Sequence, residues 1–342
     1  MRAVVYDSPF NFTVREIPVP EPGLGEMRVR VTQTGFCGTD LHLHAGGFMG
    51  TFPLIPGHET VGIVDALGEG VTGFAACEQV TINPNFGCGL CPYCREGRTL
   101  LCDDLRATGV TRPGMFAEQV VVPATQVFSV VGLDPDVAVF TEPTSCVSHG
   151  VERLAPRPNS TALVFGAGPT GLLLAQLIAA NGASGVTVAD RAELRLETAS
   201  RLGIGSTYTM GLVSLADDVA ALRERSGADG FDLVVDATGA AALIEQCIPL
   251  ARKGGTVGFY GVADRDARVP ITPYDVFQRE ITIKGSFAEI HSFPSAIAAL
   301  RSGRVRTDGL ITHRFGLEDY GRAIDAIQHD PSVHKIVIDP WL

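Results

Sequence analysis

The stretch Ala162-Leu-Val-Phe-Gly-Ala-Gly-Pro-Thr-Gly171 places a Gly-x-Gly-x-x-Gly pattern directly after an apolar run and before the helix-compatible run 172–180. A strand, tight turn and helix in this order bring the backbone close to a pyrophosphate and point a helix amino terminus at it. We therefore predict a dinucleotide site formed by Gly166, Gly168, Pro169, Thr170 and Gly171. The alternative is an ordinary strand-to-helix turn.

The sequence after about residue 157 alternates between apolar strand-like runs and helical runs. Strands are expected at 162–165, 186–189, 233–235 and 256–259, and helices at 171–180, 192–202 and 241–251. Such alternation is typical of an α/β domain with a doubly wound parallel sheet. The second half of this pattern, 232–239 followed by 254–258, argues against the ordinary turn.

The sequence on either side of this α/β region has a different pattern of apolar runs. Short β-rich runs at 27–32, 61–64 and 116–122, interrupted by Gly and Pro, predict a barrel-like β domain. Beyond 285 the sequence predicts helices at 294–301 and 317–328 and a strand at 335–338, with no second nucleotide motif. We expect one domain from 1–150 and 286–342, and a dinucleotide-binding domain from 151–285.

Bulk composition excludes several classes of protein. The 342 residues are 45% hydrophobic and 19% charged, which suits two globular domains. A net charge of -11 with mixed signs leaves no basic stripe, so neither nucleic acid nor an anionic membrane is expected as a partner. There is no apolar run of about 18 residues and no signal-like start, which predicts a cytoplasmic protein.

Four cysteines lie close together in the sequence. Cys88, Cys91, Cys94 and Cys102 have the spacing Cys-x2-Cys-x2-Cys-x7-Cys within a glycine-containing loop. Four thiolates at this spacing predict a closed tetrahedral zinc site with a structural role, with free or disulfide-bonded cysteines as the alternative. Three further cysteines stand singly in the sequence and are expected to be small buried side chains: Cys77, Cys146 and Cys247.

A second possible metal site is spread over three segments. Cys37 lies in Gly35-Phe-Cys-Gly-Thr-Asp-Leu-His42, the pair His58-Glu59 follows, and Glu142 lies in Thr141-Glu-Pro143. Thiolate, imidazole and carboxylate together suit a catalytic zinc that keeps one position for water or substrate. Glu142 has an alternative interpretation as a first-turn helix carboxylate.

These motifs, in this order, resemble the zinc-containing medium-chain dehydrogenases, above all the branch with sorbitol, threonine and glucose dehydrogenases. The resemblance spans nearly the whole chain. It implies a GroES-like β-rich catalytic domain, a Rossmann domain, and a homo-oligomer, with a tetramer favoured over a dimer.

Carried over by residue, the resemblance implies that Cys37 and His58 bind zinc, with Glu59 and Glu142 as further ligands or holders of a metal-bound water. Thr39 matches the hydroxyl that passes the substrate proton on. His42 matches the relay histidine, with an exposed side chain as the alternative. Asp40 matches the carboxylate that orients a zinc histidine. Together with the cysteine loop, this predicts two zinc ions per chain.

The nicotinamide cofactor is predicted from the residues after the second strand. Asp190 is placed to accept hydrogen bonds from the adenosine ribose, and its charge would repel a 2'-phosphate, which favours NAD. Arg191 follows directly and would neutralise a phosphate, so NADP is the alternative. Arg195 completes the expected cofactor-binding set.

The predicted reaction is the reversible oxidation of a secondary hydroxyl of a polyol or sugar, with hydride transfer to NAD. Threonine 3-dehydrogenase and general alcohol dehydrogenase are the alternatives, and a non-catalytic dinucleotide-binding protein is a distant one. Two departures stand out. Sorbitol-type enzymes usually carry Arg-Tyr after the run that is here Lys284-Gly-Ser-Phe287, whereas this chain has Ala288-Glu289. The usual Gly-Asp-Arg-Val run appears as Cys77-Glu-Gln-Val80.

Overall fold

The computed structural model describes residues 1–342 except 48, 213 and 228. The chain forms two compact units. Unit 1 comprises Met1–Ser145, Glu289–Arg301 and Ile311–Leu342, and unit 2 comprises Cys146–Ala288 and Ser302–Leu310. Within the described residues, no helix is both long and apolar enough to cross a membrane.

Unit 2 is built on a six-stranded parallel sheet with the order β12-β11-β10-β13-β14-β15. The strands are β10 (Thr161–Phe165), β11 (Gly185–Asp190), β12 (Ser206–Thr209), β13 (Phe231–Asp236), β14 (Ala251–Phe259) and β15 (Thr282–Gly285). The first strand in sequence is central and the order reverses beside it, so the predicted doubly wound Rossmann fold is confirmed.

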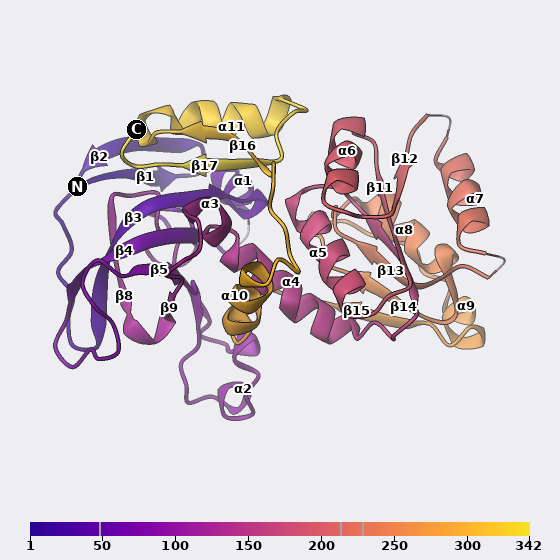
Figure 1. The fold of residues 1–342 in the computed structure, drawn as a ribbon, viewed down its shortest axis with the longest axis horizontal. Coiled ribbons are helices and arrows are strands. Elements are labelled where there is room, and N and C mark those ends of the chain that lie inside the picture. Colours follow the sequence, from indigo (N-terminus) through magenta and orange to yellow (C-terminus); the bar gives the residue numbers. More distant parts are fainter. Residues whose placement is uncertain (48, 213, 228) are drawn as a thin grey trace. The chain divides into compact units, whose positions relative to one another are not determined.

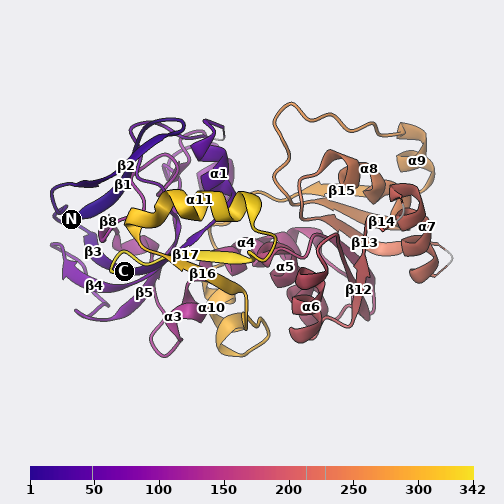
Figure 2. The same ribbon diagram turned by 90° about the horizontal axis from the view of Figure 1, so that it is seen from above.

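Helices cover both faces of this sheet. Figures 1 and 2 show α5 (Pro169–Ala180) and α6 (Glu193–Arg201) on one side of the strands, with α7 (Leu215–Arg225) and α8 (Ala241–Leu250) on the other. The helix α9 (Pro273–Gln278) precedes β15. Because both faces are covered, the central strands read as apolar runs: Leu163, Phe165 and Val234 are buried in one core cluster.

Unit 1 is β-rich, as the GroES-like prediction requires. Its main sheet has the order β16-β17-β3-β4-β5-β9, and β8 pairs with β3. The strands are β3 (Glu26–Phe36), β4 (Glu59–Leu67), β5 (Gln79–Ile82), β8 (Gln119–Pro123), β9 (Val127–Ser129), β16 (Ile311–Phe315) and β17 (Lys335–Ile338). Two small sheets pair β1 (Arg2–Ser8) with β2 (Asn11–Glu16), and β6 (Asn85–Phe86) with β7 (Arg106–Ala107).

The helices of unit 1 are short. They are α1 (Gly38–His44), α2 (Pro92–Arg95), α3 (Pro135–Ala138), α10 (Phe293–Arg301) and α11 (Tyr320–His329), and α4 (Thr141–Leu154) begins in this unit. The C-terminal segment returns to the N-terminal one, since β17 runs antiparallel to β3 and Tyr320 packs in a cluster with Val4 and Phe36 (Figure 1).

Residues 302–310 differ from the expected domain boundaries, because the structure groups them with unit 2 rather than with the C-terminal segment. The cause is a buried glutamine on α5. The Gln176 side chain accepts a hydrogen bond from the Arg306 amide at 2.8 Å and donates to the Arg306 carbonyl at 3.1 Å. This two-way contact fastens the segment to α5.

The expectation of buried side chains is confirmed for Cys247 and wrong for Cys77, which is exposed, while Cys146 is half-buried. Cys77 lies exposed in the turn between β4 and β5, with φ 66°. This left-handed conformation costs a side-chain-bearing residue about 1–2 kcal/mol and is free to glycine. The turn geometry therefore accounts for the glycine that usually opens this run.

Candidate active site

The four-cysteine set forms one compact group in unit 1. The Sγ atoms of Cys88, Cys91, Cys94 and Cys102 lie within 4.8 Å of one another. Their loop, which carries α2, extends away from the strands of the unit (Figure 1). All four are free cysteines. A Cβ added at Gly87 would lie 2.8 Å from the Cys94 Sγ, so the absence of a side chain there permits the group to close.

Backbone amides stabilise negative charge on these sulfurs. The amides of Leu90 and Cys91 donate to the Cys88 Sγ at 3.4 and 3.3 Å. These hydrogen bonds lower the pKa of Cys88 to about 6. Four sulfurs this close together, with Cys88 favoured as the thiolate, fit a tetrahedral zinc ion and leave no position for a substrate.

The mixed set is assembled by the main sheet. Ligand atoms of Cys37, His58 and Glu59 lie within 4.8 Å of one another. Cys37 sits between β3 and α1, while His58 and Glu59 stand at the start of β4. The antiparallel register pairs Gly35 with Glu59, which brings the end of one strand to the beginning of the other.

Lys335 is a buried cation at this site that the sequence analysis did not identify. Its Nζ forms an ion pair with the Glu59 carboxylate, and the side chains are 5% and 2% exposed. A Cβ at Gly35 would collide with that carboxylate and lie 2.8 Å from the Lys335 Cε. Gly35 therefore leaves the space in which the pair forms. A lysine opening a buried strand was the available signal, because a buried lysine requires a partner.

Asp40 lies behind His58. Its Oδ2 accepts a hydrogen bond from the Cys37 amide at 2.9 Å, and its Oδ1 lies 3.7 Å from the His58 Nδ1. Burial raises the pKa of Asp40 to about 6, against the opposing effect of His58. Burial by itself lowers the pKa of His58, but Asp40, Cys37 and Glu142 together hold that pKa well above its ordinary value. The site therefore attracts positive charge.

The remaining predicted residues lie around this set. Glu142 is buried in the first turn of α4, consistent with either of its interpretations; it is not part of the compact three-residue group but acts electrostatically on His58. The Thr39 hydroxyl lies 3.8 Å from the Cys37 Sγ. His42 is half-buried on α1. The thiolate, imidazole and carboxylate donors fit a zinc ion with an open position.

The glycine loop of unit 2 has the geometry of an anion site. Gly166 adopts φ 103°, and a Cβ at Gly171 would collide with the Gly166 carbonyl. Gly168 is the N-cap of α5, Pro169 occupies its first turn, and no side chain caps the helix. Its first amides are thus available to a phosphate. Thr170, like Gly168 and Pro169, is half-buried.

The Asp190 carboxylate also joins two segments of the backbone by hydrogen bonds. Its Oδ2 accepts from the Ala167 amide at 2.7 Å and its Oδ1 from the Ala192 amide at 2.8 Å. Each carboxylate oxygen keeps a lone pair for a ribose hydroxyl. Arg191 is exposed and lies close to Gly211, since its Nε is 3.7 Å from the position that an added Cβ on Gly211 would take. Arg195 is half-buried on α6.

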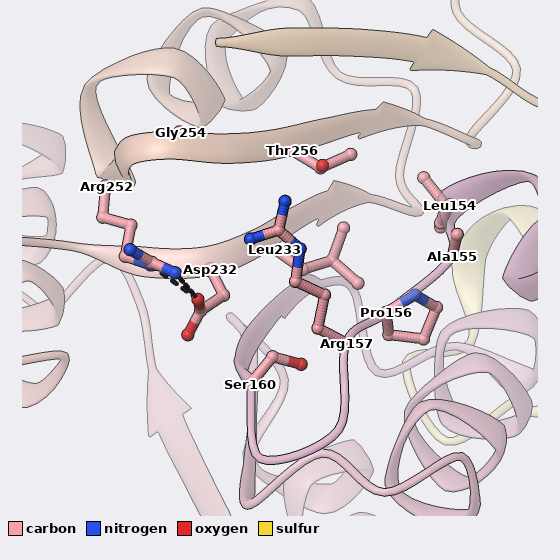
Figure 3. Close-up of a pocket in the computed structure, with 10 residues that line it drawn as sticks. All are labelled: Leu154, Ala155, Pro156, Arg157, Ser160, Asp232, Leu233, Arg252, Gly254 and Thr256. Carbon is pink, nitrogen blue, oxygen red and sulfur yellow. Dashed lines mark hydrogen bonds and ion pairs between the residues drawn. The ribbon is translucent and has the colours of Figure 1, made fainter. Parts of the chain in front are cut away.

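A cavity elsewhere in unit 2 is not a cofactor site. It has a volume of about 30 Å³ and is lined by residues near the amino ends of the strands, with the Arg252–Asp232 ion pair at one side (Figure 3). A space of this size holds about one water. Cofactors of this fold bind at the opposite, carboxyl ends of the strands.

Two family models match the chain. "Alcohol dehydrogenase GroES-like domain" matches residues 23–132, and "Zinc-binding dehydrogenase" matches residues 169–302. Among curated relatives, D-arabinitol dehydrogenase 1 of Uromyces fabae is 39% identical over 99% of this chain and 97% of its own. D-altritol 5-dehydrogenase of Agrobacterium fabrum is 37% identical over 98% of each chain.

Solved structures agree in fold. A zinc-binding dehydrogenase from Sinorhizobium meliloti 1021, bound to NADP, matches with TM-score 0.91 and 34% identity over 99% of each chain. An alcohol dehydrogenase from Escherichia coli CFT073, complexed with NADH, matches with TM-score 0.91 and 29% identity over 99% of each chain.

Proposed function

The chain belongs to the zinc-containing medium-chain alcohol and polyol dehydrogenase family, and from this premise we propose that it oxidises a secondary hydroxyl of a polyol to the carbonyl, with NAD as hydride acceptor. The observation that carries the proposal is the compact set of Cys37, His58 and Glu59, of which the last two are buried. The predicted membership and fold class are confirmed by these relatives.

The residues divide the work. Cys37, His58 and Glu59 would hold the metal, with Glu142 as a further ligand, and a bound zinc ion would supply Lewis acidity toward a hydroxyl. Asp40 holds the Cys37 amide and faces the His58 ring, which limits the movement of both donors. Lys335 holds one Glu59 oxygen and balances its charge. Thr39 would take the substrate proton and His42 would pass it toward water.

Polyols are favoured over threonine as substrates. The arabinitol and altritol enzymes are 39% and 37% identical to the chain, whereas the L-threonine 3-dehydrogenase of Shigella sonnei is 31% identical. Ala288 and Glu289 replace the Arg-Tyr pair of sorbitol-type enzymes, which argues for a polyol other than sorbitol. Threonine and simple alcohols remain the second candidates.

A substrate panel tests this function. D-arabinitol, D-altritol, sorbitol, L-threonine and ethanol are each offered with NAD, and NADH absorbance is followed. We expect the highest kcat/KM with a pentitol or hexitol. A preference for threonine would contradict the polyol assignment, and no turnover in zinc-replete protein would support a non-catalytic dinucleotide-binding protein.

The proposed preference for NAD rests on Asp190. Because this carboxylate also ties two backbone amides, Asp190→Ala would loosen the loop as well as remove the charge. Asp190→Asn removes the charge and keeps one of the two acceptor oxygens, so it retains one of the two amide contacts that Asp190→Ala loses. We expect it to lower kcat/KM for NAD by about 10-fold to 100-fold, the range of a charged hydrogen bond, and to reduce the penalty against NADP. A higher kcat/KM with NADP than with NAD in the wild-type chain would contradict this preference. It would indicate that Arg191 determines the choice of cofactor.

Three further proposals concern the whole protein. Two zinc ions per chain are supported by the two separate donor sets. A cytoplasmic location is supported by the four free cysteines of the closed set, which a reducing compartment would preserve. A homo-oligomer, tetramer before dimer, is carried by the family resemblance, and light scattering of the purified protein tests it.

A further inference from the structure

Glu289, one of the two residues that replace the Arg-Tyr pair, is a buried carboxylic acid outside the proposed set of metal ligands. Its side chain is 0% exposed and lies in unit 1, at the point where the chain returns from unit 2. Neither carboxylate oxygen forms a regular hydrogen bond within the described residues. A buried acid in this state is costly and requires a reason.

Two asparagines fix the backbone on which Glu289 stands. Asn85 donates to the Glu289 carbonyl at 3.1 Å, and Asn83 donates to the Ile290 carbonyl at 2.8 Å. Asn83 is itself held, since its Oδ1 accepts from the Asn85 amide at 2.9 Å and its carbonyl accepts from Gln126 at 2.8 Å. Glu289 is therefore held against unit 1 by residues about 200 positions earlier in the chain.

The Glu289 carboxyl lies near the first turn of α4. The polar groups around it are the side chains of Asn85 and Ser145 and the amide of Ser292. The Ser145 hydroxyl donates at 2.7 Å to the carbonyl of Glu142, three residues earlier in the same turn. Glu289 and Glu142 thus share a neighbour, and the two carboxyl groups also interact electrostatically.

We propose that Glu289 is a positioning residue for Glu142: it braces the first turn of α4 through Ser145 and directs the Glu142 carboxylate toward the Cys37, His58 and Glu59 set. This proposal rests on the proposed metal site. Two buried carboxyl groups repel each other when both are charged. A cation bound to one of them reduces this repulsion. Burial, followed by the Glu142 carboxylate, raises the pKa of Glu289 well above its usual range, in keeping with that crowding.

Cobalt binding to the full chain tests the brace without reference to turnover. The cysteine loop is first filled with zinc, and Co²⁺ is then titrated into the mixed set while its absorption bands are recorded. Loss of a group that supports a metal ligand costs about 10-fold to 100-fold in affinity, so we expect Glu289→Ala to weaken Co²⁺ binding by that amount and to shift the bands. Glu289→Gln keeps the size and hydrogen-bonding groups, and is expected to lose much less.

Ser145→Ala removes the hydroxyl through which Glu289 is proposed to position Glu142. This variant tests the proposal even if Glu289→Ala does not fold. It should weaken Co²⁺ binding in the same direction, and the double variant should lose less than the sum of the single losses. Ser160→Ala, a buried serine of unit 2, is the matched control and should bind as wild type does.

Wild-type affinity and spectrum in Glu289→Ala, or equal losses in the Ala and Gln variants, would overturn the brace. A wild-type chain that takes up no Co²⁺ once its cysteine loop holds zinc would instead remove the metal site on which the proposal rests. The two failures are therefore distinguishable.

Discussion

The two candidate metal sites of unit 1 are built in opposite ways. The four-cysteine set comes from one loop, Cys88 to Cys102, and its members are half-exposed except Cys102. The mixed set draws Cys37 from the end of β3 and His58 and Glu59 from the start of β4, and places them beside Lys335 from the far end of the chain. A local loop can hold a metal by its spacing alone, whereas the mixed set depends on the register of the sheet.

Because of this difference, we expect one site to contribute to stability and the other to catalysis. A closed set of four thiolates leaves no ligand position for a substrate, so its contribution is to stability. The mixed set would keep one ligand position open on a bound metal, and its charged groups raise the pKa of His58, which marks a region that attracts cations. Substitutions should therefore affect turnover at one site and stability at the other.

The largest effect is expected for Cys37→Ser, which replaces a thiolate by a poor zinc ligand. Lewis-acid stabilisation is worth several kcal/mol, so kcat should fall by at least about 1000-fold while the Tm changes little. Turnover measures kcat, calorimetry measures the Tm, and metal analysis gives the zinc content. Cys77→Ser is the matched control, because Cys77 is exposed and outside both sets. A large loss of Tm would contradict the division between the sites.

Thr39→Val tests the proton path of the open site. General acid–base groups contribute about 100-fold to 10,000-fold, and kcat/KM should fall within this range. His42→Gln should lose less and respond to added buffer, because water can partly replace an outer imidazole. The measurement is a pH profile of kcat/KM at saturating NAD with zinc content verified. Near-normal turnover in zinc-replete Thr39→Val would leave Glu59 or a water as the acceptor.

Cys91→Ser tests the closed site, since Cys91 supplies both a sulfur and the N-cap of α2. A metal at 100 times its Kd contributes about 2.7 kcal/mol to stability, and the variant should lose about this amount. Denaturant unfolding with and without a chelator measures the loss. Activity per folded molecule should be retained, and a fall equal to that of Cys37→Ser would break the comparison.

The smallest effect is expected for Cys77→Gly, a cysteine of neither site. Glycine adopts its φ of 66° without strain, but also makes the unfolded chain more flexible, so the net gain in stability should be up to about 1 kcal/mol. Chemical denaturation measures it, with metal content expected to stay unchanged. A loss of stability would show that the thiol makes a contact worth more than the relieved strain.

Much of the fold follows from local patterns. The glycine loop after Ala162–Phe165 and the alternating runs behind it predict the parallel sheet, because both faces of such a sheet are buried. The boundary near 302 did not follow, since the Gln176 contact with Arg306 joins residues 130 positions apart. The exposure of Cys77 did not follow either, because a turn, and not hydrophobicity, places that residue.

The sequence by itself determined the residue types and the local spacing of the four-cysteine set, whose members lie within fifteen positions of one another and come together in one loop. Only the tertiary structure decided which charges meet at the open site. Lys335 reaches Glu59 because β17 and β4 both flank β3, and the backbone at Glu289 is held by Asn83 and Asn85 from an earlier part of the chain. Such pairings depend on strand order and burial, which act between residues too far apart in the sequence to leave a local pattern.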